Sequence, residues 1–172
     1  MWMKVIGIIC ILVSGMMWGF IRASKYRNRT KQLRALKFAI KRLETEINYS
    51  LTPLRLGLHK IAASCDFPIQ ELFETASSSM ENQHLDVNQA WRMAIVQVWP
   101  KLDLKQQEKD LLVQFGTTLG ISNRDDQVKH IQLIMQQLSL LEEHALTDQS
   151  KHEQSSKSIG IMLAILIVLL FV

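Results

Sequence analysis

The sequence predicts an all-α protein, a small six-helix bundle flanked by N- and C-terminal transmembrane helices. Two apolar runs without a charge, Val5–Ile21 and Ile159–Val172, lie toward the two ends of the chain. Between them, apolar residues recur every three or four positions, which is typical of amphipathic helices, and no useful period-2 strand pattern appears. We therefore expect a transmembrane anchor at 1–22, a cytosolic helical domain at 23–155 and a C-terminal transmembrane segment at 156–172.

The first apolar run indicates an uncleaved membrane anchor. As a helix, Val5–Ile21 reaches about 25 Å, and its flanking residues bring it close to the roughly 30 Å hydrocarbon core. A secretory signal peptide is the competing interpretation, but here the basic residues follow the apolar run and no small-residue cleavage site closes it. The basic stretch from Arg22 to Arg34 holds no acidic residue, so the positive-inside rule predicts an external N-terminus and a cytosolic middle segment.

The second apolar run, Ile159–Val172, is shorter. It reaches about 21 Å as a helix, so it could cross a thinned bilayer, begin earlier in the chain or enter only from the interface. A buried core helix is a further alternative, although such a helix normally keeps a polar stripe. Small residues one turn apart can let membrane helices pack closely, and this weaker prediction concerns two pairs, Gly15 with Gly19 and Gly160 with Ala164.

Three helices are expected in the first half of the middle segment. A long helix over Lys31–Leu51 is predicted by the stripe Leu33, Leu36, Ile40, Leu43, Ile47 and Leu51. Pro53 can open a second helix, whose apolar face is Leu54, Leu58, Ile61 and Cys65. Pro68 starts a third helix with Ile69, Leu72, Phe73, Ala76 and Met80 on its face. The polar stretch Ser77–His84 is expected to end it as a loop.

Three further helices complete the expected bundle. Asp86 is the predicted N-cap of a helix that carries Ala90, Trp91, Ala94, Ile95 and Val98 and ends near Trp99. Asp103 is the predicted cap of the fifth helix, which carries Leu111, Leu112, Phe115 and Leu119 and closes at Gly120. Ser122 or Asn123 would cap the sixth helix, whose apolar face is Val128, Ile131, Met135, Leu138 and Ala145. This helix has no breaker between Asp125 and Ser155, so it could continue into the second membrane segment.

No sequence pattern indicates catalysis, a cofactor or a metal. The chain has no phosphate-binding glycine loop, no H-E-x-x-H motif and no cysteine pair at zinc spacing, so we predict that it is not an enzyme. The acidic pair Asp125–Asp126 is interpreted as a helix N-terminus, His130 as a solvated side chain and Cys65 as a small buried hydrophobe. Charges such as Lys41, Arg42, Glu44 and Glu46 are interpreted as a solvated face, and the near-balanced charge gives no reason to expect nucleic-acid binding.

Several stretches, in this order and spacing, resemble the stage III sporulation protein AB family of endospore-forming bacteria. The resemblance covers nearly the whole chain and includes Leu43–Ile47, Thr52-Pro53-Leu54, Ala90-Trp91 and Gly116–Gly120. The motif positions that it singles out are Glu44, Glu46, Thr52, Pro53, Trp91, Gly116, Gly120, Arg124, Asp126 and Gln127. Asn123 stands where an aspartate is expected, a change that keeps the ability to cap a helix.

The resemblance implies a bundle similar to the cytoplasmic domain of the type II secretion inner-membrane F protein. It also implies a non-enzymatic platform in a secretion-like channel between mother cell and forespore, in the mother-cell membrane around the forespore. The expected partners are a cytosolic secretion-type ATPase, other membrane components of the channel, membrane lipids and a possible second copy of the chain. Two alternatives stay open, namely a regulatory membrane protein that senses a cytosolic ligand and a self-associating helical anchor.

Overall fold

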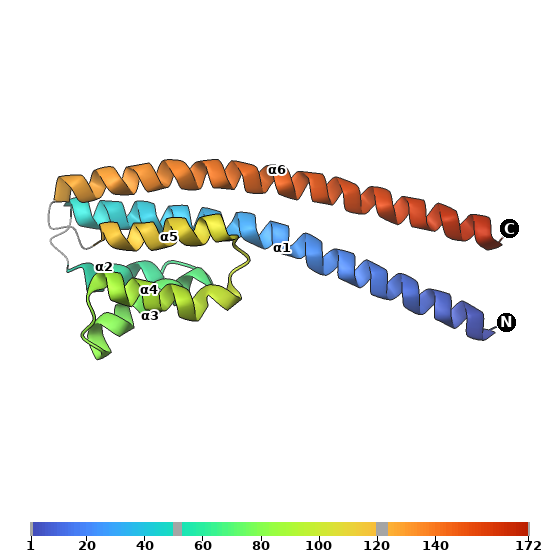
Figure 1. Cartoon of the computed structure of the whole chain (residues 1–172), viewed down its shortest axis with the longest axis horizontal. Coiled ribbons are helices and arrows are strands. Elements are labelled where there is room, and N and C mark those ends of the chain that lie inside the picture. Colours follow the sequence, from blue (N-terminus) through green and yellow to red (C-terminus); the bar gives the residue numbers. More distant parts are fainter. Residues whose placement is uncertain (1, 50–52, 120–123, 172) are drawn as a thin grey trace. The chain divides into compact units, whose positions relative to one another are not determined.

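The computed structural model describes the backbone of residues 2–49, 53–119 and 124–171, and the side chains of 17, 21, 23–48, 53–119 and 126–152. Within these residues the chain forms helices and no strand (Figure 1). In chain order they are α1 (Trp2–Tyr49), α2 (Leu54–Ala62), α3 (Ile69–Asn82), α4 (Val87–Val98), the short 3₁₀ helix η1 (Trp99–Lys101), α5 (Gln106–Thr118) and α6 (Arg124–Phe171). The all-α class and the six α-helices are therefore confirmed.

The chain divides into two compact units. One comprises Met1–Thr30 with His144–Val172, and the other comprises Lys31–Glu143. The helix predicted over Lys31–Leu51 is part of the longer α1, because no helix-breaking residue separates it from the preceding apolar run. The sixth helix likewise continues without a break to Phe171, as its lack of breakers predicted.

Most side chains of the two predicted membrane segments lie outside the described residues. Apart from Met17 and Ile21, the side chains of Val5–Ile21 and Ile159–Val172 lie outside the described residues. Among the described residues, no helix has a stretch long and apolar enough to cross a bilayer. The pairs Gly15 with Gly19 and Gly160 with Ala164 also fall outside the described side chains, so their packing role stays a prediction.

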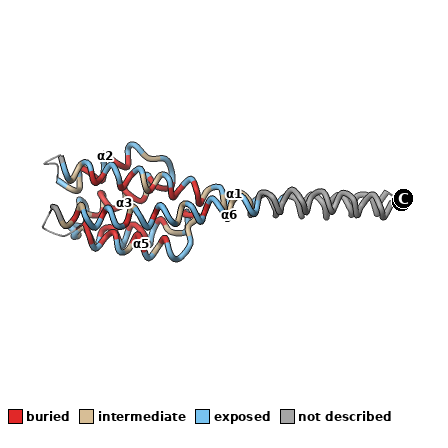
Figure 2. The backbone as a smooth tube through the Cα atoms, turned by 90° about the horizontal axis from the view of Figure 1, so that it is seen from above, coloured by how far each residue is buried: buried red, intermediate tan, exposed pale blue. Residues whose placement is uncertain are grey.

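The core of the Lys31–Glu143 unit is built from the apolar stripes that the sequence predicted. In Figure 2 the buried residues, in red, alternate with exposed ones along each helix, as expected for amphipathic helices. Helix α3 packs against α2 and α4, and α4 packs against α5. The largest fully buried side chains include Trp91, Phe73, Phe115, Leu33, Leu36, Ile40 and Leu43. Ile134 of α6 is buried as well, a core position that the predicted stripe omitted.

The end of α3 differs from the prediction. The polar stretch from Ser77 does not end the helix, which continues to Asn82, because its serines find partners there. The hydroxyl of Ser77 donates to the backbone carbonyl of Arg55 at 3.1 Å, and that of Ser79 contacts the sulfur of Met93 at 3.6 Å. Both serines are buried, so they belong to the packed face of α3 and not to a loop.

Two other local predictions are corrected. Asp103 does not cap α5; Lys105 holds the N-cap position, where its backbone N–H donates to Oε2 of Glu108 at 2.7 Å. The N–H of Asp103 instead donates to Oε1 of Gln32 at 2.8 Å, which ties this loop to α1. Cys65 lies beyond the end of α2 and is only half-buried, because the helix stops at Ala62 and the chain turns there.

Other element ends agree with the sequence within a residue. Asp86 caps α4 as predicted, with its Oδ1 accepting from the N–H of Gln89 at 3.0 Å. Pro53 holds the N-cap position of α2, and its carbonyl accepts from the N–H of Gly57 at 3.1 Å. Helix α4 ends at Val98, one residue before the predicted stop at Trp99. The predicted caps Ser122 and Asn123 and the predicted closing residue Gly120 lie outside the described residues.

Candidate functional site

Trp91 is the centre of the packing between α4 and α5. Its side chain is fully buried, and its Nε1–H donates to the carbonyl oxygen of Leu112 at 2.7 Å. The rings of Phe73 and Phe115 stand edge-on to it, each with a centroid 5.2 Å away. A Cβ atom at Gly116 would come within 2.4 Å of Cδ1 of Trp91, so glycine is the residue that this close approach allows. Two separate motif positions are thus brought into direct contact.

Gln127 is a further motif position, and the structure gives it a definite contact. Its side-chain Nε2 donates to the carbonyl oxygen of Leu119 at 2.7 Å, just beyond the last residue of α5. This contact satisfies a carbonyl that the end of the helix leaves without an intrahelical partner. Gln127 is buried, so it ties the start of α6 to the end of α5 from within the Lys31–Glu143 unit. Its role is structural, and it holds no group at a reactive site.

Glu44 is buried, which corrects its interpretation as part of a solvated face. Its carboxylate accepts a 2.7 Å hydrogen bond from Nζ of Lys41 and a 3.1 Å hydrogen bond from Nε2 of Gln132 on α6. Burial acts to raise the pKa of Glu44, but the two hydrogen bonds and the charge of Lys41 outweigh it and hold that pKa below its ordinary value. Glu44 is therefore an ionised link between α1 and α6.

A second carboxylate, which is only partly buried, joins the same two helices. Glu142 of α6 accepts from Nζ of Lys37 at 2.8 Å and from Nε of Arg34 at 2.7 Å. The hydrogen bond from Lys37, followed by that from Arg34 and the charges of both, lowers the pKa of Glu142 against the opposing effect of burial. Together, Glu44 and Glu142 form a charged seam along the α1–α6 contact in the Lys31–Glu143 unit.

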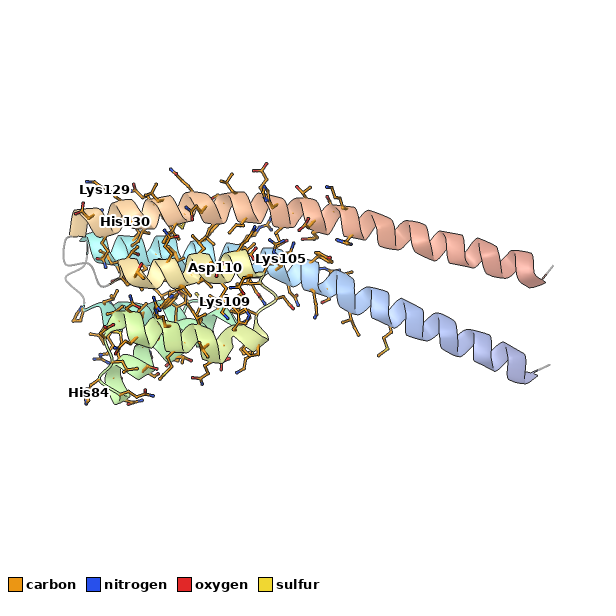
Figure 3. All side chains as sticks on the ribbon, in the orientation of Figure 1. His84, Lys105, Lys109, Asp110, Lys129 and His130 are labelled. Carbon is orange, nitrogen blue, oxygen red and sulfur yellow. The ribbon has the colours of Figure 1, made fainter. Side chains whose placement is uncertain are left out.

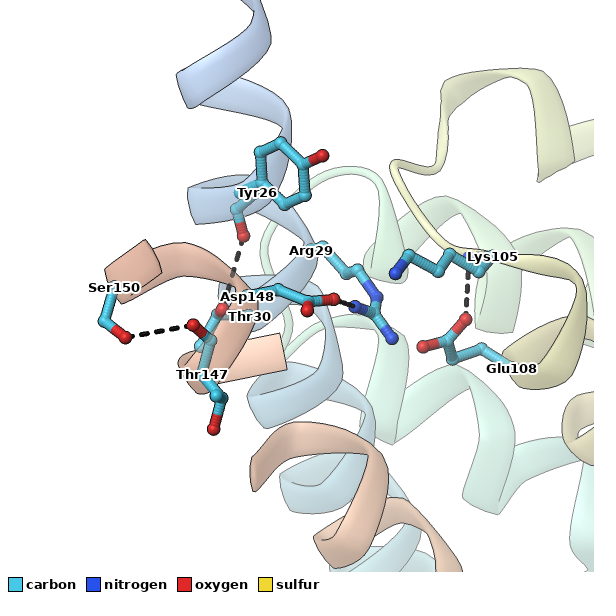
Figure 4. A network of polar contacts seen from close by, with 8 residues as sticks. All are labelled: Tyr26, Arg29, Thr30, Lys105, Glu108, Thr147, Asp148 and Ser150. Atoms are coloured by element: carbon cyan, nitrogen blue, oxygen red, sulfur yellow. Dashed lines mark hydrogen bonds and ion pairs between the residues drawn. The ribbon is translucent and has the colours of Figure 1, made fainter. Parts of the chain in front are cut away.

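The other unit has a polar link of its own. Nη1 of Arg29 lies 3.0 Å from Oδ2 of Asp148 (Figure 4). The Arg29 side chain is almost completely buried. One turn away on each helix, the ring of Tyr26 stacks on that of His152 with centroids 3.9 Å apart. These pairs join α1 to α6 within the unit of Met1–Thr30 and His144–Val172.

The remaining motif positions lie apart from each other. Glu46 is half-buried, with Oε2 3.8 Å from Nζ of Lys60, and Asp126 pairs at 3.6 Å with Lys129 on the exposed start of α6. Figure 3 shows Lys129 and His130 at this end of α6, and His130 is exposed as predicted. Thr52, Gly120 and the side chain of Arg124 lie outside the described residues. The described motif residues therefore do not converge on one reactive point.

The described residues offer little for ligand chemistry. No group of three or more histidine, cysteine, aspartate or glutamate side chains among them could hold a metal. A polar hollow of about 250 Å³ lies on the α3–α4 side, and Glu74, Ser78 and Gln97 are among its lining residues. Glu74 at its rim is paired with His59 at 3.4 Å. Besides the carboxylate of Glu74, the hollow presents amides and hydroxyls, and these groups form no catalytic arrangement.

Several of these contacts carry no signal in the sequence. The buried position of Glu44 could be suspected only from its place between Leu43 and Ile47, near the edge of an apolar stripe. Gln127 and Gln32 bond backbone groups of distant elements, which no local pattern predicts. Gly116 was predicted by resemblance alone, and its reason appears only when α5 is placed against Trp91.

A family model and a known protein sequence match the chain along nearly its whole length. The family model for stage III sporulation protein AB matches residues 4–172. The stage III sporulation protein AB of Bacillus subtilis (strain 168) is 36% identical over 168 residues, which is 98% of this chain and 98% of that protein. A solved structure titled stage III sporulation protein AB matches with a TM-score of 0.69 and 36% identity, covering 72% of this chain and 98% of the solved one.

Proposed function

Because the chain belongs to the stage III sporulation protein AB family, we propose that it is a non-enzymatic, membrane-anchored platform of a sporulation-specific, secretion-like channel. The observation that carries the proposal is the match over residues 4–172, which includes both apolar runs and the whole helical middle segment. In this role the chain holds a rigid helical unit beside a membrane, where other channel proteins dock on it.

The interior of the Lys31–Glu143 unit supports a platform better than an enzyme. Three of its buried polar side chains make structural contacts: Trp91 with Leu112, Gln127 with Leu119, and Glu44 with Lys41 and Gln132. Catalysis needs groups held ready for a substrate within hydrogen-bond reach of one another. Groups that are already paired with the protein itself serve to fix its shape.

The two long helices support the membrane anchorage. Helices α1 and α6 each continue from the bundle into an apolar run, and a helix satisfies all of its backbone hydrogen bonds inside a bilayer. The basic stretch that follows Ile21 supports a cytosolic position for the bundle, with both chain ends outside. We propose that in a sporulating cell the bundle lies in the mother-cell cytosol, within reach of the secretion-type ATPase that we propose as its partner.

The proposal is tested by deleting the gene for this chain in the endospore-forming bacterium that carries it. We expect cells that engulf the forespore but then lose late forespore gene expression and spore yield, with rescue by the full chain. In parallel, a tagged full chain is purified in detergent from sporulating cells and probed for the ATPase. Normal spore yield and normal late forespore expression after deletion would contradict the proposal.

A further inference from the structure

One face of α1 carries four exposed cations around an exposed phenylalanine. We name it the basic face, defined by Lys31, Arg34, Phe38, Lys41 and Arg42, all of them exposed. At 3.6 residues per turn these five residues fall within an arc of about 100° around the helix. The other residues in that arc from Lys31 to Thr45 are uncharged. Phe38, at its centre, is 57% exposed.

The opposite side of the same helix is packed into the core. Leu33, Leu36 and Ile40 are fully buried, so α1 is fixed in rotation and the basic face points away from the bundle. More than half of the Phe38 side chain, in the middle of this charged helix face, lies outside this packing. Exposure of its apolar ring to water is unfavourable in free energy, and burial of the ring against a partner would remove that cost.

Two of the four cations form ion pairs with carboxylates that lie closer to the interior. Glu142 binds Arg34 and Glu44 binds Lys41, each at 2.7 Å, and the two acidic side chains are only 14% and 8% exposed. These ion pairs immobilise the long basic side chains before any partner arrives, which reduces the entropy lost on binding. Within the described part of the chain, no carboxylate forms an ion pair with the cation at position 31 or 42.

We propose that the basic face docks an acidic surface of a partner protein, in which carboxylates surround an apolar hollow that receives Phe38. Protein interfaces are enriched in aromatic residues and arginine, and an apolar centre within a polar rim is their common arrangement. The inference rests on the proposed function and deepens it, because it assigns the site on this chain where the cytosolic partner of the channel binds.

An anionic membrane surface fits the face less well. Membrane-binding helices present a broad apolar face with several large side chains, whereas the basic face offers one ring. The carboxylates of Glu44 and Glu142 also offset part of its charge, which weakens attraction to a diffuse anionic surface. Carboxylates placed at fixed points on a protein can still approach Lys31 and Arg42 closely.

The test measures binding of the purified secretion-type ATPase to the full chain in nanodiscs of neutral lipid. We compare wild type with Phe38→Ala and with the double variant Lys31→Glu/Arg42→Glu. The matched controls are on the exposed side of α6, where Leu133 is 55% exposed and the Lys129 side chain is 74% exposed. They are Leu133→Ala and Lys129→Glu. All five positions are exposed, so each variant should keep the wild-type melting temperature.

We expect Phe38→Ala to weaken binding about tenfold or more, as loss of a central aromatic anchor does. The double charge reversal should weaken binding at least as much and flatten its dependence on salt, whereas the two control variants should stay within about twofold of wild type. Equal binding by wild type and both basic-face variants would overturn the assigned site and leave the proposed function standing. Absence of binding by wild type would overturn both.

One further arm separates the two kinds of acidic surface. The same nanodiscs are mixed with phosphatidylserine vesicles, which offer anionic headgroups and no protein. Wild type and Phe38→Ala are expected to associate with these vesicles equally weakly. Strong association that is lost in Phe38→Ala would identify the occupant as a membrane and would overturn the protein-docking proposal.

Discussion

Replacing Gly116 by alanine should destabilise the bundle although alanine is the better helix former. The new Cβ would lie 2.4 Å from Cδ1 and 3.1 Å from Cγ of Trp91, far inside van der Waals contact. The indole cannot easily retreat, because its Nε1–H is bonded to the carbonyl of Leu112 and the rings of Phe73 and Phe115 flank it. Either α5 must move away from α4 or the tryptophan must leave its position.

The size of the effect follows from two opposing contributions. Alanine in place of glycine inside a helix gains at most about 1 kcal/mol. Overpacking of a core costs about 1–3 kcal/mol, and a clash with a ring enclosed on both sides belongs at or above the upper end. We therefore expect a net loss of about 2 kcal/mol in the free energy of unfolding. For a small domain this corresponds to a fall in Tm of roughly 10 °C.

Gly57→Ala is the matched control. A Cβ at Gly57 would meet only Cδ1 of Leu43, at an ordinary contact distance of 3.8 Å. The helix-forming preference should then prevail and leave the Tm equal to wild type or slightly higher. Both variants and wild type are melted as full chains in detergent, with tryptophan fluorescence as the signal. A Gly116→Ala protein as stable as wild type would refute the close packing of α5 on Trp91.

Three further results are expected. Gln127→Ala loses the hydrogen bond to Leu119 and should cost about 1 kcal/mol in urea unfolding, whereas an unchanged midpoint would deny the contact. The pKa of Glu142 is lowered, so this residue stabilises the fold above its unfolded pKa, and the contribution is lost as the pH falls through its folded pKa. Glu142→Gln should therefore lower the Tm at pH 7 and make the Tm fall less steeply in acid than that of wild type. A variant whose Tm falls in parallel with that of wild type would contradict this. Burial raises the pKa of the Cys65 thiol, so in a background without the other cysteine it should react with maleimide more slowly than an unfolded control, and equal rates would contradict it.

The sequence predicts the helices well because their apolar stripes are strong and proline stops are present. Asp86 capped α4 as expected, and the stripe through Leu33, Leu36, Ile40 and Leu43 forms the buried side of α1. These features are set by residues within one or two turns of each other. They can be recognised without knowledge of the fold.

The errors occur where a distant partner changes the outcome. Ser77 and Ser79 look like loop residues, but contacts with Arg55 and Met93 keep them in α3. Glu44 looks solvated, but Gln132 from α6 completes its hydrogen bonding in the interior. Asp103 looks like a cap, but its N–H is taken by Gln32 and the helix begins later.

The face assigned to the partner was overlooked for a similar reason. The sequence shows that Lys41 and Arg42 are charged, and their exposure was expected. Their arrangement around Phe38 becomes evident only when the rotation of α1 about its axis is known. The ion pair between Arg34 and Glu142 joins two residues that are 108 positions apart in the chain.

The central claim is that apolar ends hold the bundle at the cytosolic side of a membrane. It is tested most directly by a single cysteine at Gln83, an exposed position in the loop after α3 with ordinary backbone angles, in a chain without its native cysteines. Intact cells that express the full chain are treated with a membrane-impermeant maleimide before and after permeabilisation. We expect the chain in the membrane fraction, with labelling only after permeabilisation; labelling in intact cells, or recovery of the chain without membranes, would contradict the account.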